Sequence, residues 1–211
     1  MCLDRGGLVG EDGVTHHGVF DMAAFGAVPG LVIAAPMNEP ELRNMMYTAL
    51  GSGHPFMIRY PRGHGEGLPW RGEKFETLPV GRGRRLREGA DVALLTVGTV
   101  GNAAARAAGR AAAEGVSVAH YDLRFVKPLD EALLDEVGRK FRRVVTVEDG
   151  SLRGGVGEAV AAFFNGRGYD VRVQRLGIGD EWVEHGTPGQ LYALCGYDEE
   201  GILRALLDTR A

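Results

Sequence analysis

Two segments, Leu31-Val32-Ile33-Ala34-Ala35 and Phe56-Met57-Ile58-Arg59-Tyr60, decide the fold of this 211-residue chain. Each is a short, largely apolar run that ends at a proline, a pattern typical of buried parallel strands. Between them Asn38 is a candidate N-cap, and the following apolar residues recur at helical spacing. Strand, helix and strand joined by short connections predict a βαβ unit. The residues on the expected helical face are Leu42, Met45, Met46, Ala49 and Leu50.

The chain then alternates strand and helix patterns for most of its length. Residues 64–79 are rich in glycine and proline without periodicity, which predicts a linker. Beyond it, the alternation predicts a mainly parallel, doubly wound sheet. Strands are expected at 84–87, 91–97, 116–121, 144–147 and 171–176, and helices at 102–114, 130–140, 158–164, 190–194 and 199–207. We therefore predict an α/β protein with one unit at residues 1–63, a linker at 64–79 and a second unit at 80–211.

Composition and charge exclude several classes of protein. The formal net charge is -4, and no basic face with interleaved aromatic residues is visible, which argues against nucleic-acid binding. No apolar run reaches the roughly 18 residues of a membrane helix. The two cysteines are too few for a disulfide framework, which indicates a reducing, cytoplasmic setting.

The segment 4–21 carries the densest candidate site, with one arginine, three aspartates, two histidines and five glycines. Glycines let a backbone approach a ligand closely, and charged or imidazole side chains beside it can hold a polar anion. A purely structural turn is the alternative. Residues 1–3 lead straight into this segment, with no expected strand or helix before it, so we expect the chain to be a piece of a longer protein.

Five segments carry a resemblance to a known family. The loop Asp4-Arg5-Gly6-Gly7-Leu8-Val9-Gly10, continued by residues 11–21, and the segment Tyr60-Pro61-Arg62-Gly63 resemble those of the 1-deoxy-D-xylulose-5-phosphate synthases. The stretch 121–130 with Glu148-Asp149-Gly150, and the stretch 180–186, resemble the C-terminal domain of the same family. The resemblance implies part of a pyrimidine-binding domain of the transketolase type at 1–63, followed by a transketolase C-terminal domain at 80–211.

The resemblance also implies an activity, namely the thiamine-diphosphate-dependent condensation of pyruvate with D-glyceraldehyde 3-phosphate, with loss of carbon dioxide. The family's magnesium ligands, ring-stacking aromatic residue and activating glutamate are expected upstream of Met1. We therefore assign no cofactor-binding or metal-binding residue here. We expect thiamine diphosphate and Mg²⁺ to act in the intact enzyme, and this chain alone to be inactive and to bind neither.

The resemblance assigns substrate-binding roles to Arg5, Asp12, His16 and Arg62. The two arginines are expected to clamp the acceptor phosphate, for which a planar guanidinium is well suited. Asp12 and His16 are expected to contact hydroxyl and carbonyl groups, with His16 also acting catalytically as a proton donor. A surface role for Arg62 and a structural role for His16 are the alternatives.

Several neighbouring residues are assigned no such role. The function of His17 is left open, Arg59 is expected to be structural or interfacial, and Asp21 is expected to begin a short helix at 20–25. The cluster Gly154-Gly155-Val156-Gly157 could cradle an anion. Close packing at a helix start is the interpretation we favour.

Other functions remain open at this point. A β-subunit of a 2-oxo acid dehydrogenase or a split transketolase subunit would share both domain types, and a non-catalytic assembly module is a further alternative. The segment Tyr60–Gly63 favours the synthase, because a phosphorylated acceptor calls for a second arginine. The expected partners are pyruvate, D-glyceraldehyde 3-phosphate and a second copy of the chain, since partial domains expose apolar surface.

Overall fold

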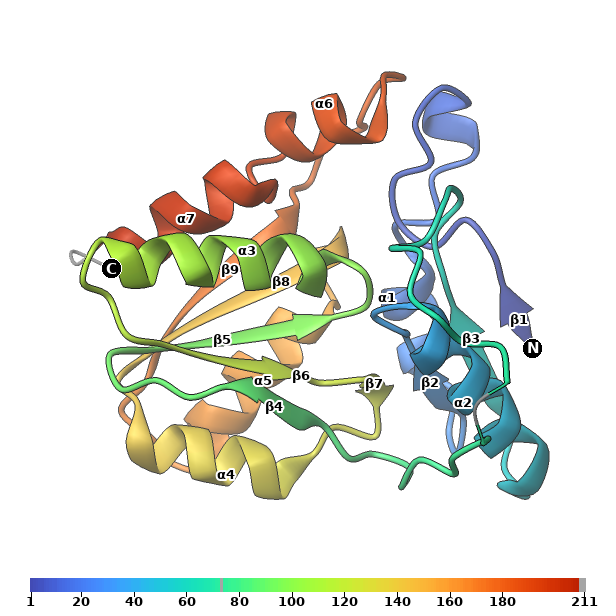
Figure 1. Ribbon diagram of the computed structural model, residues 1–211, viewed down its shortest axis with the longest axis horizontal. Coiled ribbons are helices and arrows are strands. Elements are labelled where there is room, and N and C mark those ends of the chain that lie inside the picture. Colours follow the sequence, from blue (N-terminus) through green and yellow to red (C-terminus); the bar gives the residue numbers. More distant parts are fainter. Residues whose placement is uncertain (73, 209–211) are drawn as a thin grey trace.

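The computed structural model describes residues 1–72 and 74–208, which form two sheets that lie side by side (Figure 1). The first sheet has four strands in the order β1-β3-β2-β7, and the βαβ unit that the sequence predicts lies at its centre. β2 and β3 pair in parallel, and β1 adds to β3 in parallel. The βαβ unit consists of β2 (Val32–Ala34), α2 (Glu39–Gly51) and β3 (Phe56–Arg59), and it is preceded by β1 (Cys2–Leu3) and α1 (Asp21–Gly26).

The second sheet has five strands in the order β4-β6-β5-β8-β9. All neighbours are parallel except β4, which pairs antiparallel with β6 at one edge. The strands are β4 (Arg84–Arg87), β5 (Val92–Val97), β6 (Val118–Asp122), β8 (Arg143–Ser151) and β9 (Arg172–Ile178). The predicted α/β class and mainly parallel sheet are confirmed.

Helices cover both faces of the second sheet (Figure 1). One apolar cluster joins the sheet to α3 and α7, and another joins it to α4 and α5. Each β-to-α connection places its helix on a face of the sheet, which is the doubly wound arrangement. The helices are α3 (Val100–Ala113), α4 (Glu131–Lys140), α5 (Val156–Gly166), α6 (Pro188–Leu194) and α7 (Glu199–Leu207).

Two strands depart from the sequence-based expectation. No strand was expected before the loop, but β1 forms because Ile58 N–H donates to the Met1 carbonyl and Tyr60 N–H to the Leu3 carbonyl, 2.9 and 3.0 Å away. Two residues are too few to show a periodicity, so the edge of β3 decides their conformation. The second departure is β7 (Phe125–Lys127), which follows β6 in the chain yet pairs antiparallel with β2 of the first sheet.

The predicted linker 64–79 has no helix or strand in its described residues and lies against α2. Leu78 N–H donates to the hydroxyl of Thr48 at 2.8 Å, and Arg43 donates to the carbonyl oxygen of Trp70 at 2.5 Å. The linker is therefore bound to α2 of the first unit, while the limits at 63/64 and 79/80 stay a prediction.

No helix among the described residues combines the length and apolar composition needed to cross a membrane.

Candidate functional site

The glycine-rich loop follows β1 at the carboxyl edge of the first sheet, where ligands bind in parallel sheets. Its two ends are joined by a pair of hydrogen bonds, because Gly7 and Gly18 each donate to the other's carbonyl at 2.9 Å. Gly18 cannot be replaced without movement, since an added Cβ would lie 2.1 Å from the carbonyl oxygen of Arg5. Arg5 itself has φ 60, a strained conformation for a residue with a side chain.

Three of the four predicted substrate-binding residues lie close together, two of them on this loop and one just after β3. Nη1 of Arg62, just beyond β3, lies 2.5 Å from Oδ2 of Asp12, and Nη1 of Arg5 lies 3.7 Å from the same oxygen. The side chains of Arg5, Asp12 and Arg62 are 40%, 32% and 45% exposed, so a solute can reach them. Two guanidinium groups from segments far apart in the chain thus converge on one carboxylate.

His16, the predicted catalytic residue, is exposed on the same loop, directly after the 3-10 turn η1 (Gly13–Thr15). Its Nδ1 lies 2.9 Å from the hydroxyl of Thr15. Among the described residues its hydrogen-bond partner is therefore Thr15, and no hydrogen bond joins it to Arg5 or Arg62. The structure places His16 on the loop of the arginine pair without joining it to that pair.

His17 has a structural environment. Val9 N–H donates to its Nδ1 at 3.1 Å, and its Nε2 lies 3.5 Å from the carbonyl oxygen of Glu184. An Nδ1 that accepts a hydrogen bond leaves the proton on Nε2, which then donates to that carbonyl. His17 thus ties the loop to the segment before α6.

Arg59 is buried and lies beneath the loop. Its Nε donates to Oδ2 of Asp21 at 2.6 Å, and both side chains are at most 5% exposed. Its Nη2 donates to the carbonyl oxygen of Asp149 at 2.9 Å. Arg59 therefore has a structural role in joining β3, α1 and β8, and Asp21 is the first residue of α1.

The cluster 154–157 packs around a carboxylate of the chain itself. At the start of α5, Val156 N–H and Gly157 N–H donate to the two carboxylate oxygens of Glu148 at 2.7 and 2.8 Å. Burial raises the pKa of Glu148 to about 7, although these two donors favour the charged form. The helix start is occupied by Glu148, which agrees with close packing rather than with a cradle for an external anion.

A cavity of about 640 Å³ opens between the carboxyl ends of the two sheets, and Arg62 lines it. Its other wall is formed by the first half of α3, by α6 and by the segment that joins α6 to α7, regions that no sequence motif indicated. The sequence offered only a general indication of this wall, namely that ligand sites in parallel sheets lie beyond the carboxyl ends of strands such as β5. The lining residues from the second unit include Thr99, Asn102, Arg106, Tyr192 and Tyr197.

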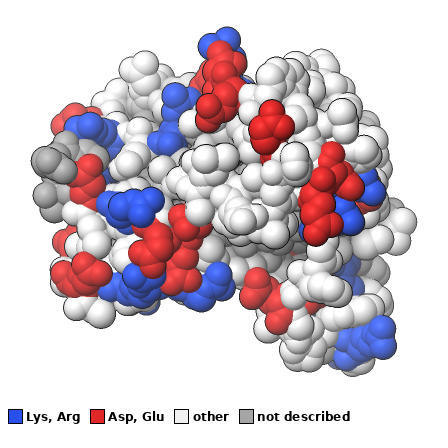
Figure 2. Space-filling model, turned by 90° about the horizontal axis from the view of Figure 1, so that it is seen from above, with Lys and Arg blue, Asp and Glu red and all other residues white. Residues whose placement is uncertain are grey.

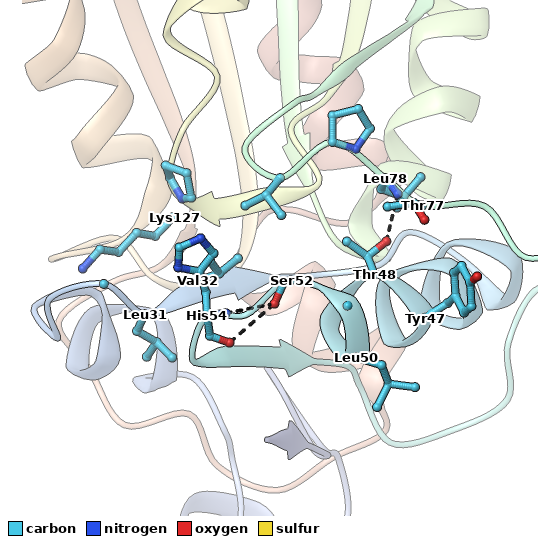
Figure 3. A pocket seen from close by; sticks show the side chains of 15 residues that line it. Leu31, Val32, Tyr47, Thr48, Leu50, Ser52, His54, Thr77, Leu78 and Lys127 are labelled. Atoms are coloured by element: carbon cyan, nitrogen blue, oxygen red, sulfur yellow. Dashed lines mark hydrogen bonds between the residues drawn. The ribbon is translucent and has the colours of Figure 1, made fainter.

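A larger cavity, of about 890 Å³, lies at the opposite end of β2. Figure 3 shows Leu31, Val32 and Leu78 around it, with Lys127 at one side. No arginine lines it, and Lys127 Nζ donates to the carbonyl oxygens of Gly26 and Val28. Its lining is poorly suited to a phosphate, so the candidate site is the smaller cavity.

No group of three or more His, Cys, Asp or Glu side chains within residues 1–72 and 74–208 could hold a metal ion. Figure 2 shows basic and acidic side chains interspersed on the face seen from above, with no large patch of one sign. The described residues therefore place Arg5, Asp12 and Arg62 beside a cavity and contain no group of side chains suited to a metal ion.

The two sheets and the loop define a class of protein. The family model of the transketolase pyrimidine-binding domain matches residues 1–66, and that of the transketolase C-terminal domain matches residues 81–202. The chain belongs to the transketolase family. This confirms the resemblance stated from the motifs.

The curated relatives are more specific. The chain is 56% identical over 212 aligned residues to the 1-deoxy-D-xylulose-5-phosphate synthase of Bacteroides fragilis, which covers 100% of this chain and 33% of that protein. It is 46% identical to the synthase of Symbiobacterium thermophilum, covering 96% of this chain and 31% of that protein. The chain thus matches a C-terminal portion of these synthases and spans about one third of their length.

Two solved structures show the same architecture. A split gene transketolase, described as an inactive beta4 tetramer, matches with a TM-score of 0.84 and 27% identity, covering 97% of this chain and 64% of that chain. The transketolase of Campylobacter jejuni matches with a TM-score of 0.74 and 18% identity, covering 99% of this chain and 31% of that chain, which shows the fold alone.

Proposed function

We propose that the chain forms the acceptor-binding part of a thiamine-diphosphate-dependent synthase that joins pyruvate to D-glyceraldehyde 3-phosphate. The observation that carries the proposal is the convergence of Arg5 and Arg62 on Oδ2 of Asp12, beside a cavity that Arg62 lines. The identity of 46–56% to synthases of this name supports the same conclusion.

Each residue then has a chemical role. The forked guanidinium groups of Arg5 and Arg62 bind the phosphate dianion and fix its distance from the aldehyde carbon. Asp12 keeps the two cations together and accepts a hydrogen bond from the acceptor hydroxyl. His16 is exposed and lies four residues along the loop, where an imidazole can give a proton to the oxygen of the acceptor carbonyl.

The cofactor would supply the electron sink for the carbanion that decarboxylation creates. The described residues form no metal-ligating group, so we assign to this chain no step through thiamine diphosphate or Mg²⁺. We propose that these 211 residues alone bind neither group and have no synthase activity. Magnesium-dependent, micromolar binding of thiamine diphosphate to this chain in calorimetry would contradict this.

We also propose that the chain self-associates and works in the cytoplasm. Leu50 is 89% exposed on α2 beside the half-exposed Met46 and Tyr47, an apolar face that a second copy can cover. The split transketolase of the same architecture is described as a beta4 tetramer. Cys2 and Cys195 are free, which suits a reducing compartment. A monomer at high concentration in analytical ultracentrifugation would contradict the self-association.

Turnover tests the activity directly. This chain would be combined with the N-terminal part of a curated relative, and carbon dioxide release from pyruvate would be measured with D-glyceraldehyde 3-phosphate and with unphosphorylated glyceraldehyde. We expect a strong preference for the phosphorylated acceptor. Equal turnover of both aldehydes would refute the phosphate clamp. Reaction of a ketose phosphate donor without release of carbon dioxide would favour the split transketolase.

A further inference from the structure

One buried carboxylate of the second unit reaches into the substrate loop of the first. Asp149, on β8, accepts hydrogen bonds at Oδ1 from Leu8 N–H at 3.0 Å and from the hydroxyl of Tyr197 at 2.8 Å. Oδ2 accepts from the hydroxyl of Tyr192 at 3.3 Å. Asp149 is 4% exposed, so its carboxylate is held by protein donors rather than by solvent.

The loop backbone lies directly against this carboxylate. Gly7 has φ 87, and a Cβ added there would lie 2.0 Å from Oδ2 of Asp149. A side chain at position 7 would therefore displace the carboxylate, and its absence lets the amide of Leu8 approach. Because Gly7 is also joined to Gly18, one contact with Asp149 holds both ends of the loop that carries Arg5 and Asp12.

The same network reaches the second arginine of the site. Nη2 of Arg59 donates to the Asp149 carbonyl at 2.9 Å and contacts the Gly18 carbonyl at 3.4 Å. Arg59 ends β3, and Arg62 follows three residues later. The residue pair 59 and 149 thus fixes the loop and the end of β3 against one another.

The two tyrosines that donate to Asp149 also border the cavity. Tyr192 and Tyr197 line it from the side opposite Arg62. Burial and the charge of Asp149 raise the pKa of both phenols, so both remain protonated and can donate. The carboxylate therefore connects the substrate loop with the far wall of the cavity.

We propose that Asp149 is a positioning residue, which sets the distance of Arg5 and Asp12 from Arg62 and thereby the affinity for a phosphorylated acceptor. The identity of the ligand, a phosphorylated acceptor, rests on the proposed function. The anchoring of the loop by Asp149 is independent of that function. The role is carried by a residue outside the unit that binds the phosphate, so the second unit takes part in acceptor recognition.

The test uses Asp149→Asn and Tyr197→Phe in this chain, with Asp170→Asn as the control. Asp170 carries a carboxylate that is 95% exposed and pairs with Arg142 at 3.4 Å. Hydrogen exchange at the Leu8 amide reports loop anchoring, and calorimetry with D-glyceraldehyde 3-phosphate reports acceptor binding. Both are measured well below the unfolding temperature of each variant.

We expect Asp149→Asn to speed exchange at Leu8 and to weaken acceptor binding about ten- to a hundredfold, since small misplacements of binding groups have effects of this order. Tyr197→Phe should act in the same direction with a smaller effect, and Asp170→Asn should change neither quantity. A purely structural residue would lower the unfolding temperature of the folded protein without changing either readout.

The remaining combinations of exchange and affinity would each contradict one part of the proposal. Faster exchange with unchanged affinity, or weaker affinity with unchanged exchange, would overturn the positioning role. Unchanged exchange with unchanged affinity would overturn the anchoring as well. If the unaltered chain fails to bind the phosphorylated acceptor, the proposed function and the acceptor role of Asp149 fail together, while the exchange of Leu8 still decides whether Asp149 anchors the loop.

Discussion

Replacing Arg62 by alanine tests the proposal that Arg5 and Arg62 bind the acceptor phosphate. Arg62 approaches Asp12 at 2.5 Å, whereas Arg5 lies 3.7 Å from the same oxygen. Arg5 has a φ of 60, whereas Arg62 does not have a positive φ. Arg62→Ala therefore removes a charge without adding backbone strain. Arg62 is therefore the more informative of the two arginines to change.

The magnitude follows from exposure. A hydrogen bond to a charged group contributes about 1.5–3 kcal/mol. With the Arg62 side chain 45% exposed, solvent screening places the value at the lower end, about 1.5–2 kcal/mol, or a tenfold to thirtyfold loss of affinity. The pair with Asp12 is equally open to solvent, so its loss should cost about 0–1 kcal/mol of folding free energy.

Calorimetry with D-glyceraldehyde 3-phosphate, with thermal unfolding alongside, measures both quantities. Arg62→Lys retains the charge but loses the forked geometry, so it should recover part of the affinity. Arg142→Ala is the matched control, because that side chain is 78% exposed and pairs with Asp170. Equal affinity for the acceptor in Arg62→Ala and in the unaltered chain would refute the clamp.

Two further changes test the loop and the buried acid. Gly18→Ala should destabilise the protein by about 2 kcal/mol or more, because its Cβ would meet the Arg5 carbonyl, whereas Gly26→Ala has open space and should be nearly neutral in urea unfolding. The pKa of Glu148 is raised from 4.5 to about 7, so the folded state binds more protons and stability should fall as pH rises from 4.5 to 7. Glu148→Gln should remove this contribution to the pH dependence of the unfolding free energy, which is at most about 1.4 kcal/mol per pH unit. The same pH dependence in both proteins would show that the pKa of Glu148 is not raised on folding.

Much of the fold was accessible from local sequence patterns. The apolar runs around Ile33 and Ile58, each closed by a proline, predicted β2 and β3, and the apolar face after Asn38 predicted α2. These elements depend on burial and periodicity over a few residues. Their limits shift by one to four residues, as at β8, whose end at Ser151 is set by pairing with Ile178 rather than by hydropathy.

The candidate site was accessible in part. The residue types and the family resemblance drew attention to Arg5, Asp12 and Arg62, and the structure brings these three together. Periodicity could not reveal that Tyr192 and Tyr197 form the opposite wall of the cavity. Their place depends on how the second unit docks on the first.

The sequence by itself determined the alternation of strands and helices, the glycine-rich loop and the membership of a family, because each is written in residues close together in the chain. Tertiary structure alone decided that β7 joins the first sheet and that Asp149 holds Leu8, 141 positions away. The unpaired edge of β2 needs hydrogen-bond partners, and so does the buried carboxylate of Asp149. Both needs arise only once the two units have packed against each other, so a local sequence pattern does not reveal these contacts.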